Sequence, residues 1–244
     1  MAGFQQIGVG RYIEFLGDAN EDRNVKGNFN PEKIFAEYNF TEKALDSTNK
    51  YTKFLDTDST VELGSGGAVF TTPATDTKTC SLSQGGIWWY PSKNPVMEAK
   101  FKIDVITTVA INVGFSDATA EGTGALPFTI SGTTITDTAT DGAMFCFDTN
   151  QDTDYWYIVN TKNGTQGGTI LASTYVPVAA TDATLRVAID SSGNARYFYN
   201  GVQVGYKASA VTSTIPLIPY VGIRNNTATA HILTLRYVRC WADC

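Results

Sequence analysis

The stretch that decides the fold is Met97-Glu98-Ala99-Lys100-Phe101-Lys102-Ile103. Its apolar residues occupy every second position, and the residues between them are Glu98, Lys100 and Lys102. Successive side chains of an extended strand point to opposite faces, so this pattern predicts a strand with one buried and one solvated face. One-sided burial of this kind is typical of an antiparallel sheet.

Outward from this stretch, the chain beyond about Thr60 consists of short segments rich in Val, Ile, Thr, Phe and Tyr. Turn residues separate the segments, and Asp190–Asn194 and Asn200-Gly201 are strong hairpin signals. Many short strands without alternating helices indicate a two-sheet sandwich rather than a parallel sheet. We expect strands near residues 68–72, 87–90, 96–104, 109–116, 143–148, 155–160, 185–190, 196–199, 217–223 and 232–241.

The N-terminal part differs from the rest because it holds much of the charge and few apolar residues. A short strand is expected within residues 11–16. Asn30 suits a helix N-cap and Pro31 the first helical position. Apolar residues follow at near-helical spacing: Ile34, Phe35, Tyr38 and Leu45. We therefore predict an N-terminal arm over residues 1–58 containing one short helix, and an all-β, antiparallel jelly-roll sandwich domain over residues 59–244.

Length and charge exclude several classes of function. A chain of 244 residues can bury a large core without disulfides or metals. The net charge is −6 and no basic run occurs, so nucleic acid is not an expected partner. No apolar run reaches the roughly 18 residues of a membrane span. The start, Met1–Gln6, does not resemble a secretory signal, so we expect synthesis in a cytoplasm.

The four cysteines are Cys80, Cys146, Cys240 and Cys244. They are too few and too unevenly spaced for a disulfide scaffold. Cys146 lies in an apolar run and is expected to be a buried thiol. Cys240 and Cys244 offer only two ligands with no nearby His, which does not meet the four-ligand requirement of a structural zinc site.

The last third of the chain carries a family resemblance. The segments 183–190 and 195–204 look like a hairpin of the concanavalin A-like lectin/glucanase jelly rolls. The segments 220–225 and 233–239 are similar to the closing strands of that superfamily, and 88–91 leading into 98–103 resembles its early strands. The resemblance covers about residues 60–241 and implies the jelly-roll fold, but it says little about activity.

Relatives of this fold that cleave glycans carry Glu-x-Asp-x-x-Glu on one strand, and this motif is missing here. Glu98 and Asp104 share a strand side but lie roughly 20 Å apart, far beyond the about 5–5.5 Å that retaining hydrolysis needs. His231, the only histidine, is expected to be a packed or rim residue. No Ser lies in a Gly-x-Ser-x-Gly elbow. We expect no enzymatic activity.

Two groups of residues are candidate binding sites. Oxygen-bearing side chains alternate at Asp148, Asn150, Asp152 and Asp154, as in the first half of a calcium loop, although the Gly and Glu of that motif are missing. The alternative is an acidic turn whose side chains cap backbone N–H groups. Exposed aromatic side chains can stack on sugars, and the candidates are Trp88, Trp89, Trp156 and Tyr157. Core packing and a subunit interface are the alternatives for them.

A second resemblance concerns context. An acidic, Thr-, Gly- and Ala-rich jelly roll behind a polar arm looks like the decoration, cement and fibre proteins of tailed-phage virions. We therefore expect a structural protein of a virion that assembles with copies of itself and with other virion proteins such as the major capsid protein. The alternative is a lectin-like module that binds a cell-surface glycan. An unrecognised glycan hydrolase is the third reading.

Overall fold

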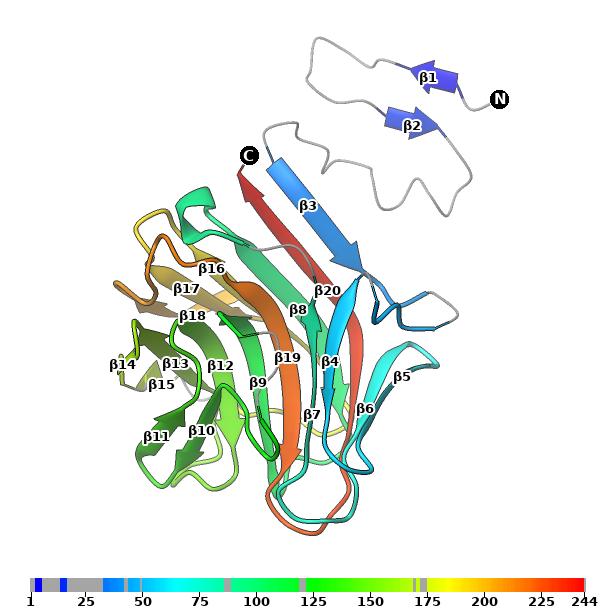
Figure 1. Cartoon of the computed structure of the whole chain (residues 1–244), viewed down its shortest axis with the longest axis vertical. Helices are drawn as coiled ribbons and strands as arrows, with labels where there is room; N and C mark the ends of the chain where they lie inside the picture. The colour runs from blue at the N-terminus through cyan, green and yellow to red at the C-terminus, as the bar shows by residue number, and fades with distance from the viewer. Residues whose placement is uncertain are drawn as a thin grey trace.

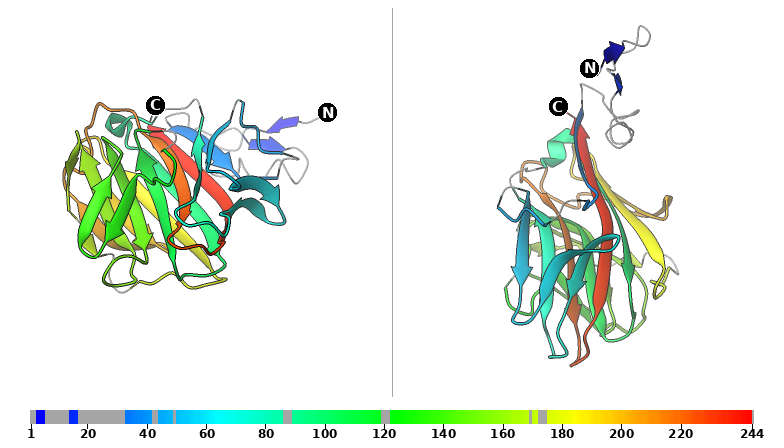
Figure 2. Two further views of the ribbon diagram at one scale, coloured as in Figure 1. Left: turned by 60° about the horizontal axis from the view of Figure 1, so that its bottom comes forward. Right: turned by 90° about the vertical axis from the view of Figure 1, so that its right-hand side faces the viewer.

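The computed structural model describes residues 3–5, 14–16, 33–41, 44–48, 50–85, 89–118, 122–168, 170–171 and 175–243. Within them the regular structure is β-strand, apart from one 3-10 turn, η1 (Pro91–Lys93). Two antiparallel sheets stack on each other, and the right-hand view of Figure 2 shows them as two layers. The predicted all-β jelly-roll sandwich is confirmed. Among the described residues, no helix has the length and apolar character needed to cross a bilayer.

Sheet I is one of the two layers. In spatial order its strands are β14 (Thr165–Gln166), β13 (Tyr157–Lys162), β12 (Gly142–Asp148), β9 (Val109–Ser116), β19 (Ile218–Asn225), β7 (Thr79–Gln84) and β4 (Tyr51–Leu55). The short β15 (Ile170–Leu171) also pairs with β13. The bounds of β9 agree with the predicted strand at 109–116.

Sheet II is the other layer. In spatial order its strands are β18 (Val202–Lys207), β17 (Ala195–Tyr199), β16 (Asp182–Ile189), β8 (Val96–Ile103), β20 (Ile232–Asp243), β6 (Gly67–Thr71) and β5 (Thr60–Gly64). The long β20 pairs with β8 along most of its length, with β6 near its start, and with β3 (Lys33–Tyr38) near its end. Figure 1 shows β3 and β20 side by side near the C-terminus.

Two small hairpins complete the described elements. One joins β1 (Gly3–Gln5) to β2 (Glu14–Leu16). Strand β2 confirms the last three residues of the strand predicted at 11–16, and residues 11–13 lie outside the described part of the chain. The other joins β10 (Phe128–Ser131) to β11 (Thr134–Asp137), through a turn in which Gly132 has a φ of 58°. The strand expected at 87–90 is only partly described, and there Trp89 makes an isolated bridge to Leu217.

The core lies between the sheets and follows the alternation of the sequence. Met97, Ala99, Phe101 and Ile103 are all buried, whereas the residues between them on β8 are partly exposed. A bulge between Leu235 and Tyr237 in β20 changes the alternation, so that Leu235 and Val238 both face the core. Each fully buried Phe or Leu side chain contributes about 1.5–3 kcal/mol to folding.

The predicted helix is wrong. Of its residues, 30–32 lie outside the described part of the chain, and Ile34, Phe35 and Tyr38 belong to strand β3, which pairs with β20. Ala36 and Tyr38 pack against the core on one side of the strand, while Glu37 on the other side binds Arg239. Pairing with the open side of β20 therefore outweighs the near-helical spacing of the apolar residues.

The predicted arm also contains strands of the sandwich. Strand β4 pairs with β7 at the edge of sheet I, and its first residue, Tyr51, is buried in the core. The ring of Tyr51 lies 5.1 Å from that of Tyr38 on β3, so the two segments pack together. The sandwich thus begins before residue 59, because β3 and β4 both form part of its sheets.

Candidate functional site

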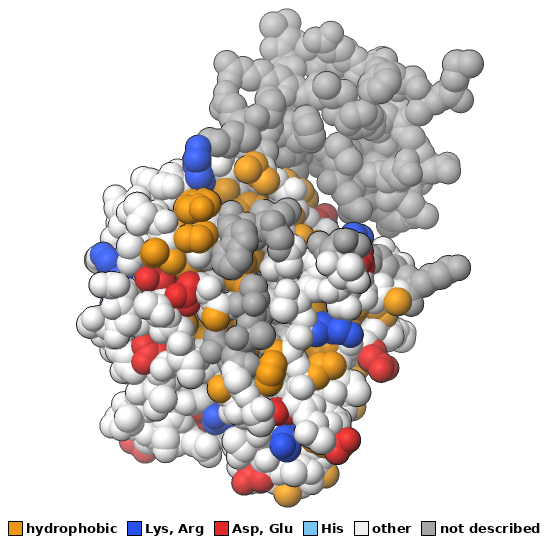
Figure 3. Space-filling view, in the orientation of Figure 1, with side chains coloured by type: hydrophobic (Ala, Val, Ile, Leu, Met, Phe, Trp, Pro, Cys, Tyr) orange, Lys and Arg blue, Asp and Glu red, His pale blue; other side chains and the backbone are white. Residues whose placement is uncertain are grey.

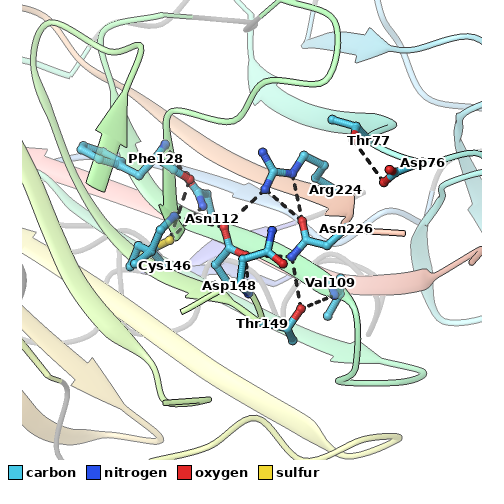
Figure 4. Close-up of polar contacts among 12 residues, drawn as sticks. Asp76, Thr77, Val109, Asn112, Phe128, Cys146, Asp148, Thr149, Arg224 and Asn226 are labelled. Carbon is cyan, nitrogen blue, oxygen red and sulfur yellow. Dashed lines mark hydrogen bonds and ion pairs between the residues drawn. The ribbon is translucent and has the colours of Figure 1, made fainter. Parts of the chain in front are cut away.

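A buried carboxylate lies at the centre of the polar network in Figure 4. Asp148 ends β12 and is fully buried. Its Oδ2 accepts hydrogen bonds from the backbone N–H of Ile130 at 3.1 Å and from Arg224 Nη2 at 3.4 Å. Its Oδ1 accepts bonds from the N–H of Asn150 at 3.0 Å and from Asn226 Nδ2 at 2.7 Å. The positive charge of Arg224 compensates the buried negative charge.

This geometry favours the capping alternative for the predicted calcium loop. Asp148 is engaged by protein donors, whereas Asn150, Asp152 and Asp154 are exposed. Within the described residues, no group of three or more His, Cys, Asp or Glu side chains is placed to hold a metal ion. The carboxylate instead joins three parts of the chain: the β10–β11 hairpin, the turn after β12, and the end of β19.

Two of the aromatic residues predicted to stack on sugars, Trp156 and Trp89, lie in the core. Trp156 is fully buried, with its ring 6.0 Å from that of Phe145 and 6.1 Å from that of Phe101. Trp89 is also buried, and its Nε1 donates to Gln84 Oε1 at 2.7 Å. Neither ring presents a face to a sugar, so core packing accounts for both. Trp88 lies outside the described residues.

Tyr157, the remaining aromatic candidate, belongs to a second apolar cluster on the outer face of sheet I. There the β10–β11 hairpin and the segment before it bury Leu126, Phe128 and Ile130 against the sheet. Asn112 of β9 holds this cover, because its Oδ1 accepts a bond from the N–H of Phe128 at 2.8 Å. The hairpin therefore covers the part of the outer face of sheet I formed by β9, β12 and β13. The prediction missed this hairpin, although Phe128, Ile130 and Ile135 alternate around Gly132.

Glu98 and Asp104, the two carboxylates considered for hydrolysis, contact different partners. Glu98 Oε1 accepts a hydrogen bond from the hydroxyl of Tyr237 at 2.9 Å. Asp104 Oδ1 lies 3.9 Å from Nδ1 of His231. His231 is fully buried, as predicted, and its Nε2 lies 3.2 Å from Thr108 Oγ1. Burial lowers the pKa of His231, against the opposing effects of Asp104 and the Thr108 backbone.

Three described cysteines are free and buried: Cys80, Cys146 and Cys240. Burial raises the pKa of the Cys80 thiol to about 12. Burial also raises the pKa of Cys146 and of Cys240 well above the ordinary thiol value. The thiolate is the reactive form of cysteine, so these side chains act as core residues.

A hollow lies between the sheets near β3 and β4. Apolar and aromatic side chains line most of it, among them Tyr38, Phe40, Tyr51, Met97 and Val238. Its cavity volume is about 20 Å³. Pockets for drug-sized ligands span roughly 300–1,000 Å³, so this hollow is far too small for such a ligand.

The outer face of sheet II carries a surface that no motif in the sequence indicates. We call it the arginine face, and define it as the outward side of β17, β16, β8 and β20. No described strand or hairpin lies over it. Its cationic side chains are Lys100, Lys102, Arg186, Arg196, Arg236 and Arg239. They are distant in sequence, and the strand register brings them onto one surface.

Three of these arginines lie over aromatic rings. The guanidinium carbon of Arg186 is 4.1 Å from the ring centre of Phe198, and that of Arg239 is 4.3 Å from Tyr237. Arg196 lies 5.6 Å from the ring centre of Tyr206, which is 45% exposed. A guanidinium over a ring gains cation–π attraction and keeps its N–H edges available for hydrogen bonds.

Acidic side chains compensate part of this charge. Asp182 lies 3.1 Å from Arg236 Nε and 3.7 Å from Lys100 Nζ. Glu37 of β3 accepts a bond from Arg239 Nε at 2.7 Å.

The face turned toward the viewer in Figure 3 has a different distribution of side chains. Its Lys and Arg side chains occur singly among acidic and neutral ones, and hydrophobic side chains gather in its upper part.

Solved structures share this fold. The carbohydrate recognition domain of Emp46p, in its metal-free form, matches with a TM-score of 0.58 and 12% identity over 83% of this chain and 94% of that one. The corresponding domain of Emp47p matches with 0.57 and 11% over 87% and 96%. The β-glucanase of Bacillus licheniformis matches with 0.59 and 11% over 84% and 96%. A potassium-bound form of the Emp46p domain is also similar, with a TM-score of 0.58.

These structures place the chain in the concanavalin A-like class of jelly-roll folds, as the resemblance in its sequence implied. At such low identity they show the fold alone. No protein-family model matches the chain, and no curated protein matches it.

Proposed function

We propose that this chain is a non-enzymatic carbohydrate-recognition protein and that it binds its ligand on the arginine face. The observation that carries the proposal is the difference between the two outer faces. The hairpin covers the β9, β12 and β13 part of the outer face of sheet I, whereas the outer face of sheet II combines aromatic rings with hydrogen-bond donors and no described element lies over it. Similar folds include two carbohydrate recognition domains, which favours a glycan as the ligand.

The chemistry of this face suits sugar binding. Arginine N–H groups donate hydrogen bonds to sugar hydroxyls, and the half-buried Trp241 and Phe35, which are paired across β20 and β3, offer an apolar surface to sugar C–H groups. The acids on the face are bonded to neighbours: Glu98 to Tyr237, and Glu37 to Arg239. Such an arrangement supports binding rather than hydrolysis, which needs one carboxyl group as an acid and the other as a base or nucleophile.

Amide chemical shifts in NMR spectra test the proposal. The labelled full-length chain is titrated with neutral and acidic oligosaccharides. We expect a glycan to shift amide signals of β16, β8 and β20 while leaving those of β12 and β13 unchanged. Shifts confined to sheet I would place the ligand elsewhere. If no glycan shifts any signal, the proposed function is wrong.

A further inference from the structure

We propose, as an extension of the proposed function on which it rests, that the ligand of the arginine face is an anionic glycan, bound through its carboxylate or sulfate groups. The face offers cations that the protein's own acids do not satisfy. Among the described residues, neither Arg186 nor Lys102 has an ion-pair partner. Asp182 is shared between Lys100 and Arg236, so its charge is divided between two cations.

Arg186 is the most favourable anchor for an anion. Its guanidinium lies over the ring of Phe198, and its cross-strand neighbour on β8 is Glu98, which the hydroxyl of Tyr237 engages. The stacked ring restricts the orientation of the guanidinium without using its N–H groups. A guanidinium held in this way can donate two parallel hydrogen bonds to one carboxylate or sulfate.

The positions of the cations suit a ligand with several anionic groups. Arg196 on β17 faces Ala188, which is two residues along β16 from Arg186. Two residues of strand rise and one strand spacing together separate the two arginines by roughly 8 Å. Arg239 lies two strands away from Arg186, across β8, which corresponds to roughly 10 Å at the strand spacing. Anionic groups repeated along a glycan can therefore contact more than one cation at once, which multiplies their separate affinities.

Aromatic geometry favours a glycan over a nucleic acid. The net charge of −6 does not distinguish them, because either polyanion is repelled by most of the surface and attracted to this face. Single-stranded nucleic acids bind proteins largely by stacking bases on free aromatic rings. Here arginines occupy a face of each of the rings of Phe198, Tyr237 and Tyr206.

Isothermal titration calorimetry with polymers that differ in charge tests this inference. Dextran sulfate and dextran share a backbone and differ in charge, and polygalacturonate supplies carboxylate in place of sulfate. We expect dextran sulfate, polygalacturonate or both to bind at least about tenfold more tightly than dextran, because the guanidinium groups pair with anions. Raising the salt concentration about tenfold should weaken this binding. Whichever polyanion binds more tightly identifies the anionic group.

Two variants locate the site. The double variant Arg186→Gln with Lys102→Gln should lose at least about tenfold in affinity for the polyanion, because it removes the unpaired cations. Lys78→Gln, just before β7 in sheet I, is the control and should bind within about twofold of the parent chain. Thermal unfolding of each variant confirms that it folds, and Arg186→Gln alone repeats the test should the double variant not fold.

The outcomes separate this inference from the proposed function. Equal binding of dextran and both polyanions overturns the anionic ligand but leaves carbohydrate recognition in place. Binding of single-stranded DNA as tight as that of dextran sulfate also overturns it, because the attraction is then not specific to glycans. If neither polyanion binds, the inference is wrong, and the NMR titration with neutral sugars decides separately whether the proposed function stands.

Discussion

At the scale of single residues, the chemistry of this protein depends on burial. Asp148 belongs to a polar run that resembles part of a calcium loop, yet its carboxylate is buried and bonded to Ile130, Asn150, Asn226 and Arg224. A buried carboxylate satisfied in this way stabilises the fold through its hydrogen bonds. Its role is to fix the hairpin that covers sheet I, and that role follows from contacts between segments distant in sequence.

Replacing Asp148 tests this role. Asp148→Asn removes the charge opposite Arg224 and turns an acceptor oxygen into a donor beside other donors. We expect the free energy of unfolding to fall by about 2–4 kcal/mol, as when one partner of a buried pair is removed. Urea denaturation measures the change. The exposed Asp152→Asn is the control and should change stability by less than about 0.5 kcal/mol. Equal effects of the two substitutions would contradict the structural role.

His231 gives a dependence of stability on pH. Burial lowers its pKa in the folded state, so the unfolded chain binds the proton more readily. Its contribution is therefore fully present above the unfolded pKa of about 6.5 and is lost as the pH falls below that value toward the folded pKa. Asp104 and the Thr108 backbone oppose the shift but do not reverse it.

We expect the melting temperature of the parent chain to fall between pH 7.5 and pH 5 more steeply than that of His231→Gln. Differential scanning calorimetry of both proteins across this range measures the difference. Parallel curves for the two proteins would show that another group causes the pH dependence.

At the scale of elements, local pattern predicted the strands whose alternation is strong. The run from Met97 to Ile103 became β8, and the apolar run at 109–116 became β9. Strand β3 was missed because Ala36 and Glu37 favour helix and because its partner, β20, lies about 200 residues further along the chain. The arginine face was missed for a related reason: only the register of β16, β8 and β20 brings its cations together.

Truncations test the contribution of β3 and β4. Deleting residues 1–32 leaves both strands and should preserve cooperative unfolding. Deleting residues 1–55 removes both and exposes the core around Met97 and Val238. It also leaves β7 paired only with β19 and the end of β20 paired only with β8. We expect this second chain to unfold at least about 10 °C lower, because several buried side chains are lost. Calorimetry measures the melting temperatures of the two truncated chains. Similar values would contradict this expectation and support the predicted separate arm over residues 1–58.

At the scale of the whole molecule, the two outer faces of the sandwich differ in their side chains. One is partly covered by a hairpin of the chain, and the other combines arginines, aromatic rings and acids. A recognition role for the second face is our proposal, and the structures with similar folds show the fold alone. Assembly with copies of itself and with capsid proteins on a virion stays a prediction from composition.

The buried cysteines affect how the protein responds to oxidising and reducing conditions. Cys80 and Cys240 lie in the main core, on different sheets, and Cys146 lies beneath the hairpin on sheet I. Each thiol keeps its proton at neutral pH and is shielded from solvent, so peroxide or oxidised glutathione has little access to it while the sandwich is closed. As far as these thiols are concerned, the same folded structure should persist in reducing and in oxidising surroundings, without a disulfide being made or broken.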